Sequence, residues 1–333
     1  MQADADPDAR ATGARLRRAR FVVLVLVSLV AAAETGLRAA GVTPRIASVG
    51  HERYGYVLLP EQVERSEFGL RRVNAQGFFG EDWPAPDRVA ADTFVVAVLD
   101  SSHGTGVGVG PDDAWPARLK EELASADALV LNASVGGWGI EQHAAHFADR
   151  LAAYEPDAVV IGVAPISGVP TAVRGAPGSW LRPLLARSVL VDLWQQHVNR
   201  DRDADAIPPR TAEEARRRAD RAAYLRAPLA DDARRHWGAA AEHVRAISRS
   251  QAGWGGRTLL LAAPDSGPTE FRPQELLGAV GDAEWVAPGS APPFDVRGEA
   301  LERGFLESDP RHWTAAGHRA VASAVARAIT GHH

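Results

Sequence analysis

Short apolar runs recur along this chain, and helix-forming segments separate them. The clearest run covers residues 93–99 (TFVVAVL), in which aliphatic and β-branched side chains follow one another, as in a strand buried on both faces of a sheet. Shorter runs of this kind lie at residues 128–132, 157–163, 258–263 and 284–287. Because strands that alternate with helices form parallel sheets covered on both faces, we expect an α/β protein, a three-layer α/β/α sandwich around five parallel strands.

The segments between these runs have the apolar spacing of helices, except in one long region. Helices are expected at residues 112–125, 140–154 and 314–329. Residues 168–256 break the alternation, because two largely helical stretches, 180–198 and 211–250, follow each other without a strand. We interpret residues 168–256 as a helical insertion over the carboxyl edge of the sheet, with the position of a lid.

A basic cluster precedes the most apolar stretch of the chain. Four arginines lie within residues 15–20, and the run FVVLVLVSLVAAA follows at 21–33. This order is typical of a signal sequence. An extension through Glu34 and Arg38 to residue 42 would supply the roughly 20 residues that a membrane span needs. The arginines place the N-terminus in the cytoplasm and the chain beyond residue 40 outside.

These features divide the chain into four parts. We expect a cytoplasmic basic n-region at 1–20, a signal or transmembrane segment at 21–42, a lead-in at 43–92 and the α/β domain at 93–330. The segment at 21–42 is either cleaved or retained, so the main domain is expected to be secreted or membrane-anchored, and extracytoplasmic in both cases. A buried core helix is the alternative interpretation of the apolar run, although such a helix rarely follows a basic cluster at the start of a chain.

The composition narrows the possible chemistry. The chain has no cysteine, which excludes disulfides, a thiol nucleophile and thiolate metal sites. Its net charge of −5 does not favour a nucleic-acid partner. His143 and His146 have an i, i+3 spacing that can bind a metal, but no third ligand is evident, so we expect neither a metal nor another cofactor.

Three loops carry polar side chains suited to catalysis. Sites in open α/β sheets form at the carboxyl ends of the strands. Ser102 lies in the glycine-rich segment 99–109, a second glycine-rich turn covers 132–139, and Asp309 and His312 stand just before the last helix. At the spacing i, i+3 a carboxylate can orient an imidazole, which can then take a serine proton. Ser102, His312 and Asp309 are therefore the candidate nucleophile, general base and orienting acid.

At these residues the sequence resembles the SGNH/GDSL hydrolase family. That family's first block runs roughly Gly-Asp-Ser-x-x-x-Gly-x-Gly-Val after a strand. Alignment on GVGV at 106–109 places the nucleophile at Ser102, with Ser101 as the rival. Residues 132–142 resemble the second block, NAxVxGxGxxQ, and residues 309–318 resemble the last block, Asp-x-x-His with a following Gly-His.

The resemblance extends beyond these three blocks. Residues 74–78 (NAQGF) look like the N-x-x-G-F lead-in of membrane-anchored members. The resemblance covers most of residues 50–330 and implies that the five strands have a flavodoxin-like order. It also implies that Gly137, in the second block, belongs to the oxyanion or substrate-binding site.

The chain departs from the family at the groups that would bind an oxyanion. The Gly-Asp before the nucleophile is Asp100-Ser101 here, and Ser134 stands at the position taken as the oxyanion glycine of the second block, although its backbone N–H remains. No asparagine follows the expected strand at 157–163, where Ser167 is the substitute candidate donor. The loss of one oxyanion donor typically lowers the rate by roughly 10²–10³.

The resemblance implies a serine hydrolase that acts on ester bonds, as an esterase or an O-acyltransferase. The expected partners are an acylated cell-surface glycan or lipid ester as substrate, and the membrane through residues 21–42. The alternative is a catalytically inactive binding or scaffold protein of the cell envelope. Such a protein would keep the fold and lose the chemistry together with the family's Gly-Asp and asparagine.

Overall fold

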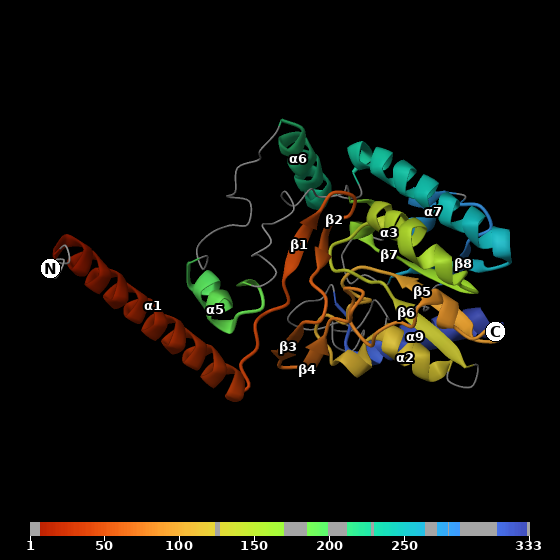
Figure 1. The fold of residues 1–333 in the computed structure, drawn as a ribbon. Coiled ribbons are helices and arrows are strands. Elements are labelled where there is room, and N and C mark those ends of the chain that lie inside the picture. Colours follow the sequence, from red (N-terminus) through yellow and green to blue (C-terminus); the bar gives the residue numbers. More distant parts are fainter. Residues whose placement is uncertain are drawn as a thin grey trace.

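The computed structural model describes residues 7–123, 127–169, 185–198, 212–227, 230–263, 272–278, 280–286 and 312–331. Figure 1 shows a long helix, α1 (Pro7–Ala39), that projects from a body in which helices cover a sheet. Asp309, the expected orienting acid, lies outside the described residues.

Five parallel strands form the sheet of the body. Along the chain they are β5 (Phe94–Leu99), β6 (Ala128–Asn132), β7 (Ala158–Val163), β8 (Arg257–Ala262) and β9 (Glu284–Val286). Their order across the sheet is β6-β5-β7-β8-β9, and every neighbouring pair is parallel. The predicted five-stranded flavodoxin-like sheet is confirmed. The loops that follow β5, β6 and β7 meet at its carboxyl edge.

Helices cover both faces of this sheet, as predicted for a three-layer sandwich. One face carries α2 (Trp115–Glu122) and α9 (Ala315–Thr330). The other carries α3 (Ile140–His146), which continues into the π-helical turn Phe147–Leu151, and α7 (Arg234–Trp254). A short helix, α8 (Pro273–Leu277), lies between β8 and β9 and packs with the α7 layer.

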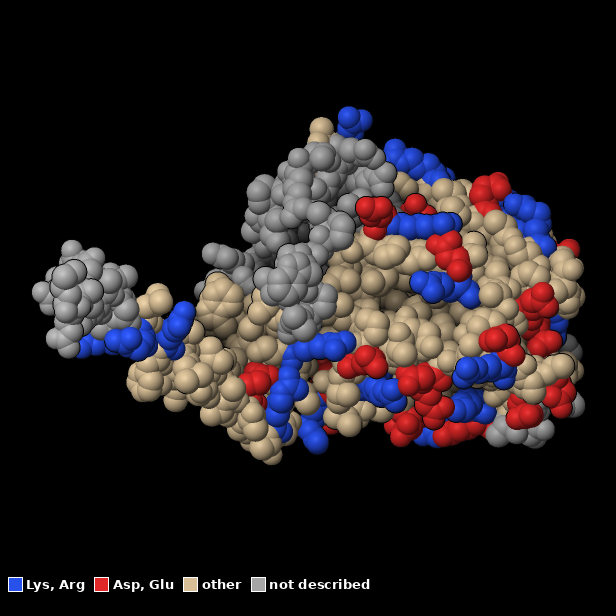
Figure 2. All heavy atoms as spheres, in the orientation of Figure 1, with Lys and Arg blue, Asp and Glu red and all other residues tan. Residues whose placement is uncertain are grey.

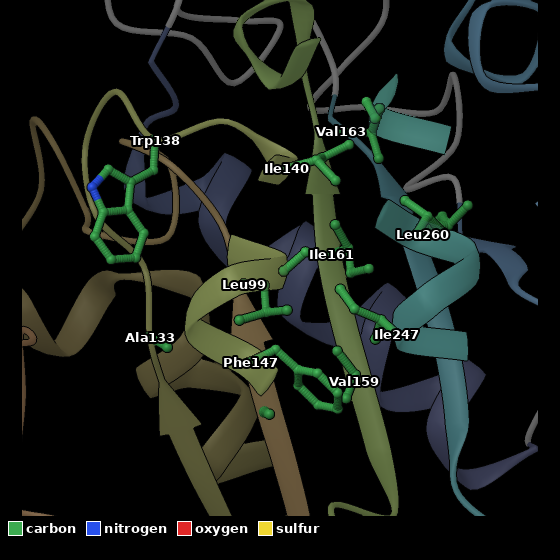
Figure 3. Close-up of a cluster of buried hydrophobic side chains, with 14 of the residues drawn as sticks. Leu99, Ala133, Trp138, Ile140, Phe147, Val159, Ile161, Val163, Ile247 and Leu260 are labelled. Atoms are coloured by element: carbon green, nitrogen blue, oxygen red, sulfur yellow. The ribbon is translucent and has the colours of Figure 1, made fainter. Parts of the chain in front are cut away.

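The strands alternate their side chains between two apolar cores. Along β5, Val96 and Val98 join the core under α2 and α9, whereas Leu99 points to the opposite core, as the two-residue period of a strand requires. Figure 3 shows this second core, where Leu99 and Ile161 lie near Phe147 and Ile247. Burial on both faces explains why the strands appear in the sequence as unbroken apolar runs.

Two antiparallel hairpins precede the sheet, in a region where the sequence shows no strand periodicity. They are β1 (Ser48–His51) with β2 (Gly55–Leu58), and β3 (Val63–Ser66) with β4 (Gly69–Arg72). Trp138 Nε1 donates a hydrogen bond to the Tyr56 carbonyl at 3.0 Å, and Gln142 Nε2 donates to the Tyr54 carbonyl at 2.9 Å. The lead-in is therefore attached to the loop after β6, which carries the second motif.

The NAQGF phrase forms a tight turn in this lead-in. The Asn74 side chain accepts hydrogen bonds from the N–H groups of Gln76 and Phe78 and donates one to the Glu81 carbonyl. Gly77 has a φ of +89°, which favours glycine. Because Phe78 is buried in the α7-side core, the motif has a structural role here.

The predicted insertion at 168–256 is only partly separate from the sandwich. It contains α5 (Val189–Val198), α6 (Ala212–Arg226) and α7. The stripe formed by Trp237, Val244 and Ile247 buries α7 in the core against the sheet. α7 therefore has the position of a crossover helix between the parallel strands β7 and β8. Among the described residues of 168–256, α5 and α6 are the helices added to the sandwich.

α1 is one continuous helix that projects from the body and contacts it near its C-terminal end, at the start of α5. The part Arg15–Ala39, 25 residues long, is apolar enough to cross a membrane, with a mean hydropathy of 1.9 and none of its most apolar window buried. At 1.5 Å per residue this part is about 37 Å long. Figure 2 shows mostly uncharged atoms along the helix, with basic side chains near its free end. The helix starts within the predicted n-region and ends at Ala39, before the predicted limit at residue 42.

Candidate active site

The structure brings Ser102 and His312 together at the carboxyl edge of the sheet. Ser102 Oγ lies 2.8 Å from His312 Nε2, which is a hydrogen-bonding distance. Both residues are only partly buried, so solvent reaches the pair. The hydroxyl of the rival, Ser101, is buried and has no hydrogen-bond partner among the described residues. This geometry favours Ser102 over Ser101 as the nucleophile.

The loop after β5 holds Ser102 in a series of tight turns. The Ser102 carbonyl accepts hydrogen bonds from the Val107 N–H and from Thr105 Oγ1. Gly106 and Gly108 have φ values of +70° and +83°, a region that side chains other than glycine rarely adopt. The glycines of the motif are thus required by the backbone of the turn that presents the serine.

The loop after β6 is joined to this serine loop by hydrogen bonds. Asn132 Nδ2 donates to the Gly104 carbonyl at 3.1 Å, and the Val135 N–H donates to the Asp100 carbonyl at 3.0 Å. A Cβ placed on Gly104 would lie 2.1 Å from Ser134 Oγ. Only glycine at position 104 therefore allows the two loops to approach this closely.

Ser134 does not offer the backbone donor that the sequence suggested. Its N–H already donates to Asn132 Oδ1 at 3.2 Å, and an N–H with an acceptor cannot also bind an oxyanion at full strength. The next turn lies beside the nucleophile, because a Cβ placed on Gly136 would be 4.0 Å from Ser102 Cβ. Neither Gly136 nor Gly137 donates its N–H to another described residue, so this turn carries the available donors.

Ser167, the proposed substitute for the missing asparagine, is used inside its own loop. Its hydroxyl donates to the Gly162 carbonyl at 3.1 Å and accepts the Ala164 N–H at 2.8 Å. These contacts close the 3₁₀ turn Pro165–Gly168 that follows β7. Both hydrogen-bonding functions of the hydroxyl are occupied, so Ser167 holds the loop in place and does not point a free donor at Ser102.

Asp100 is a site residue whose role the sequence did not indicate. Its carboxylate is 1% exposed and accepts hydrogen bonds from the Ser101 N–H at 2.7 Å and from Trp115 Nε1 at 3.0 Å. A Cβ placed on Gly162 would lie 2.1 Å from Asp100 Oδ1. The carboxylate therefore fills the space that Gly162 leaves at the end of β7. A glycine inside an apolar strand was the signal for this close approach.

Three further rings surround the pair on the α9 side. His103 is buried and stacks on Trp313 with a centroid distance of 4.2 Å, and its ring lies 5.5 Å from that of His312. His318 Nδ1 accepts the Trp115 N–H at 3.1 Å. Burial, together with the neighbouring His103 and His312, lowers the pKa of His318 to about 3. His318 is thus a neutral packing residue.

His143 and His146 are buried within an aromatic cluster, away from the Ser102–His312 pair. His143 contacts Trp138 edge-on, and His146 packs against Tyr54 and Phe78. Burial lowers the pKa of His143 to about 3 and that of His146 to about 4. Among the described residues no group of three potential ligands is placed to hold a metal.

α6 reaches the site from above the carboxyl edge. Tyr224 Oη donates to the Pro165 carbonyl at 2.7 Å, and Arg221 Nη2 donates to the Gly137 carbonyl at 3.4 Å. The side chain of Tyr224 is buried. α6 therefore contacts the loops after β6 and β7, which is the position expected of a lid.

No protein-family model and no curated protein sequence matches the chain. Solved structures with a similar fold include a putative lipolytic protein of the G-D-S-L family from Desulfitobacterium hafniense DCB-2, 11% identical with a TM-score of 0.39 over 70% of this chain and 98% of that one. TesA is 18% identical, with a TM-score of 0.40 over 69% of this chain and 95% of that one. A two-domain esterase active on acetylated mannans is 16% identical, with a TM-score of 0.43 over 72% of this chain and 49% of that one.

Two of these three structures are thus described as a G-D-S-L-family lipolytic protein and as an esterase. The strand order and the site define an α/β sandwich with a serine–histidine pair at the carboxyl edge of its sheet.

Proposed function

We propose that the chain is a membrane-anchored serine hydrolase that acts on ester bonds outside the cytoplasm. The observation that carries this proposal is the 2.8 Å contact between Ser102 Oγ and His312 Nε2. A serine within hydrogen-bonding reach of an imidazole at the end of a parallel strand is the arrangement that activates a hydroxyl for nucleophilic attack.

In the proposed reaction Ser102 Oγ attacks the ester carbonyl, and His312 Nε2 takes the serine proton. The same nitrogen then gives the proton to the leaving alcohol, which leaves an acyl group on Ser102. Water releases the acid, or an acceptor hydroxyl takes the acyl group in a transfer reaction. By sequence position Asp309 is the residue proposed to orient His312.

The proposed oxyanion donors are the N–H groups of Ser102 and of the Gly136–Gly137 turn. The engaged N–H of Ser134 and the engaged hydroxyl of Ser167 support this revision of the donor set. Donors aimed at developing charge contribute about 3–4 kcal/mol each in known cases. Acylated cell-surface glycans or lipid esters are the proposed substrates, because α1 would hold the site outside the membrane surface.

The test uses the full chain in detergent, with p-nitrophenyl acetate as substrate. Ser102→Ala and His312→Ala should each lower kcat by about 10⁴–10⁶, the range seen when a member of a serine triad is removed. Ser101→Ala should retain activity, because its hydroxyl does not contact His312. Loss of activity only in Ser101→Ala would overturn the choice of nucleophile.

A catalytically inactive envelope scaffold is the second candidate. The observations that favour it are the occupied donors of Ser134 and Ser167 and the carboxylate of Asp100 buried beside the serine loop. Folded wild-type protein that shows no turnover on acetyl, butyryl and longer p-nitrophenyl esters would favour the scaffold.

A further inference from the structure

α5 exposes an apolar face next to α1. Leu190, Leu193, Trp194 and Val198 follow the i, i+3, i+4, i+8 spacing of one side of a helix, and the exposed His197 is the one polar side chain among them. Leu193 is 42% exposed and Trp194 is 63% exposed. Large apolar side chains gathered on one exposed helix face indicate an interaction surface.

Hydrogen bonds from α1 determine where α5 begins. The Glu34 carboxylate accepts hydrogen bonds from Ser188 Oγ at 3.0 Å and from the N–H groups of Val189 at 3.0 Å and Leu190 at 3.1 Å. The first N–H groups of a helix have no acceptor within the helix, and a carboxylate is favourable at this end. Glu34 directly follows the apolar run 21–33. α5 therefore starts beside Glu34, the residue at which the uninterrupted apolar run of α1 ends.

A second contact turns the polar side of α5 toward the body. Arg45 Nε and Nη2 both lie 3.1 Å from Asp192 Oδ1, and the Arg45 N–H donates to Asp192 Oδ2 at 3.1 Å. Arg45 and Asp192 also line a hollow of about 210 Å³, together with Leu185 and Gln195. Asp192 and Gln195 thus face the chain that leads from α1 to the body, while Leu193 and Trp194 face away from it.

We propose that α5 lies in the headgroup region of the membrane that α1 spans, with Leu193 and Trp194 in contact with lipid. The inference rests on the membrane assignment of α1 in the proposed function. Amphipathic helices of this kind lie in the membrane surface, where tryptophan is enriched. Lipid is the occupant because the Glu34 hydrogen bonds hold α5 against the C-terminal part of α1, the helix that spans the membrane in the proposed function. A spanning helix and a surface helix together stop the body from rotating freely about α1.

The test uses the absence of cysteine from the chain, which allows a single reporter position. Full-length Leu193→Cys, Gln196→Cys and Val27→Cys are labelled with an environment-sensitive fluorophore and reconstituted in phosphatidylcholine–phosphatidylglycerol vesicles. Gln196 is the matched control on the polar side of the same helix. Nitroxide lipids should quench the label at position 193 several-fold more than at 196, and aqueous iodide should show the reverse order. Glu34→Gln should reduce this contrast, because it weakens the hydrogen bonds that place α5.

The outcomes separate this inference from the proposed anchor. Equal access of iodide to positions 193 and 196, with position 27 protected, would overturn the surface contact and leave the anchor intact. Access of iodide to all three positions would overturn the anchor and the inference together. Protection of position 193 from iodide without quenching by nitroxide lipids would indicate a protein contact and would also overturn the inference.

Discussion

Gly104 lies where the serine loop touches the loop after β6. A Cβ at this position would lie 2.1 Å from Ser134 Oγ and 2.8 Å from Asp100 Cβ, so Gly104→Ala must push the loops apart. We expect it to lower the free energy of unfolding by about 1–3 kcal/mol, as overpacking does, and to slow acylation of Ser102.

Thermal unfolding and single-turnover acylation measure these two effects of Gly104→Ala. Gly238→Ala in α7 is the control, because its Cβ would meet nothing within 4 Å and alanine favours a helix. Restoration of part of the stability by adding Ser134→Ala would identify the Ser134 hydroxyl as the clashing group. A Gly104→Ala variant as stable and as fast as the wild type would contradict the account.

Tyr56 is a positioning residue for the turn that carries the proposed oxyanion donors. Its hydroxyl donates a hydrogen bond to the Gly136 carbonyl. A Cβ placed on Gly137 would lie 2.8 Å from Tyr56 Oη. Loss of one hydrogen bond of this kind costs about 0.5–1.5 kcal/mol, so Tyr56→Phe should lower kcat by about 2–13-fold with little change in KM. Tyr54→Phe, which removes a hydroxyl bonded to Asp149, should leave kcat unchanged; equal effects of the two variants would contradict a specific role for Tyr56.

Among the elements, the packing of α7 on the sheet indicates that this helix belongs to the core of the body. Ile247 is 1% exposed in the core against the sheet, so Ile247→Ala should lower the free energy of unfolding of the whole body by about 2–4 kcal/mol. Denaturant unfolding measures this, with the exposed Arg249→Ala as the control on the same helix. A change in substrate preference without a change in stability would instead indicate that α7 acts as part of a lid.

The elements that the sequence predicts well are those whose local pattern has a single interpretation. Residues 93–99 and 157–163 are strands because both of their faces are buried, which leaves an unbroken apolar run. β1 and β3 escape prediction, because short hairpin strands with mixed burial have no such pattern. The boundary between α6 and α7 is not predicted either, because two successive helices give one continuous helical pattern in the sequence. Whether a helix packs on the sheet or covers the site depends on tertiary packing, which this pattern does not show.

At the site too, some features follow from sequence order and others depend on how the loops pack. The approach of Ser102 to His312 follows from their places beside the carboxyl edge of a parallel sheet, which sequence order predicts. The engagement of Ser134 by Asn132 and of Ser167 by Gly162 depends on how each loop satisfies its own polar groups. That local pairing cannot be read from residue type, so the sequence does not indicate that the N–H of Ser134 and the hydroxyl of Ser167 are already engaged.

For the whole molecule, buried histidines predict sensitivity to acid. Burial lowers the pKa of His143, His146 and His318 to about 3, 4 and 3, whereas an unfolded histidine titrates near about 6.5. As the pH falls from about 6.5 toward 4, the unfolded chain binds protons that the folded chain does not. Each histidine then lowers the stability by up to about 1.4 kcal/mol per pH unit.

Denaturant unfolding at pH 7 and pH 5 measures this acid sensitivity. His143→Leu should make the pH dependence shallower, because it removes a ring that takes up a proton between pH 7 and pH 5 in the unfolded chain and stays neutral in the folded chain. The exposed His197→Gln is the matched control, since it also removes one imidazole but from the protein surface. A stability that does not vary between pH 7 and pH 5 would contradict the buried neutral state of these rings.

The most direct test of the central claim is to locate a covalent adduct. Full-length protein in detergent is treated with a fluorophosphonate, digested, and mapped by mass spectrometry, with His312→Ala treated in parallel. The account predicts one adduct on Ser102 in the wild type and its loss or strong slowing in His312→Ala, because the 2.8 Å contact with His312 Nε2 activates this hydroxyl. An adduct on Ser101, or none in folded wild-type protein, would contradict the assignment of Ser102 as an activated nucleophile.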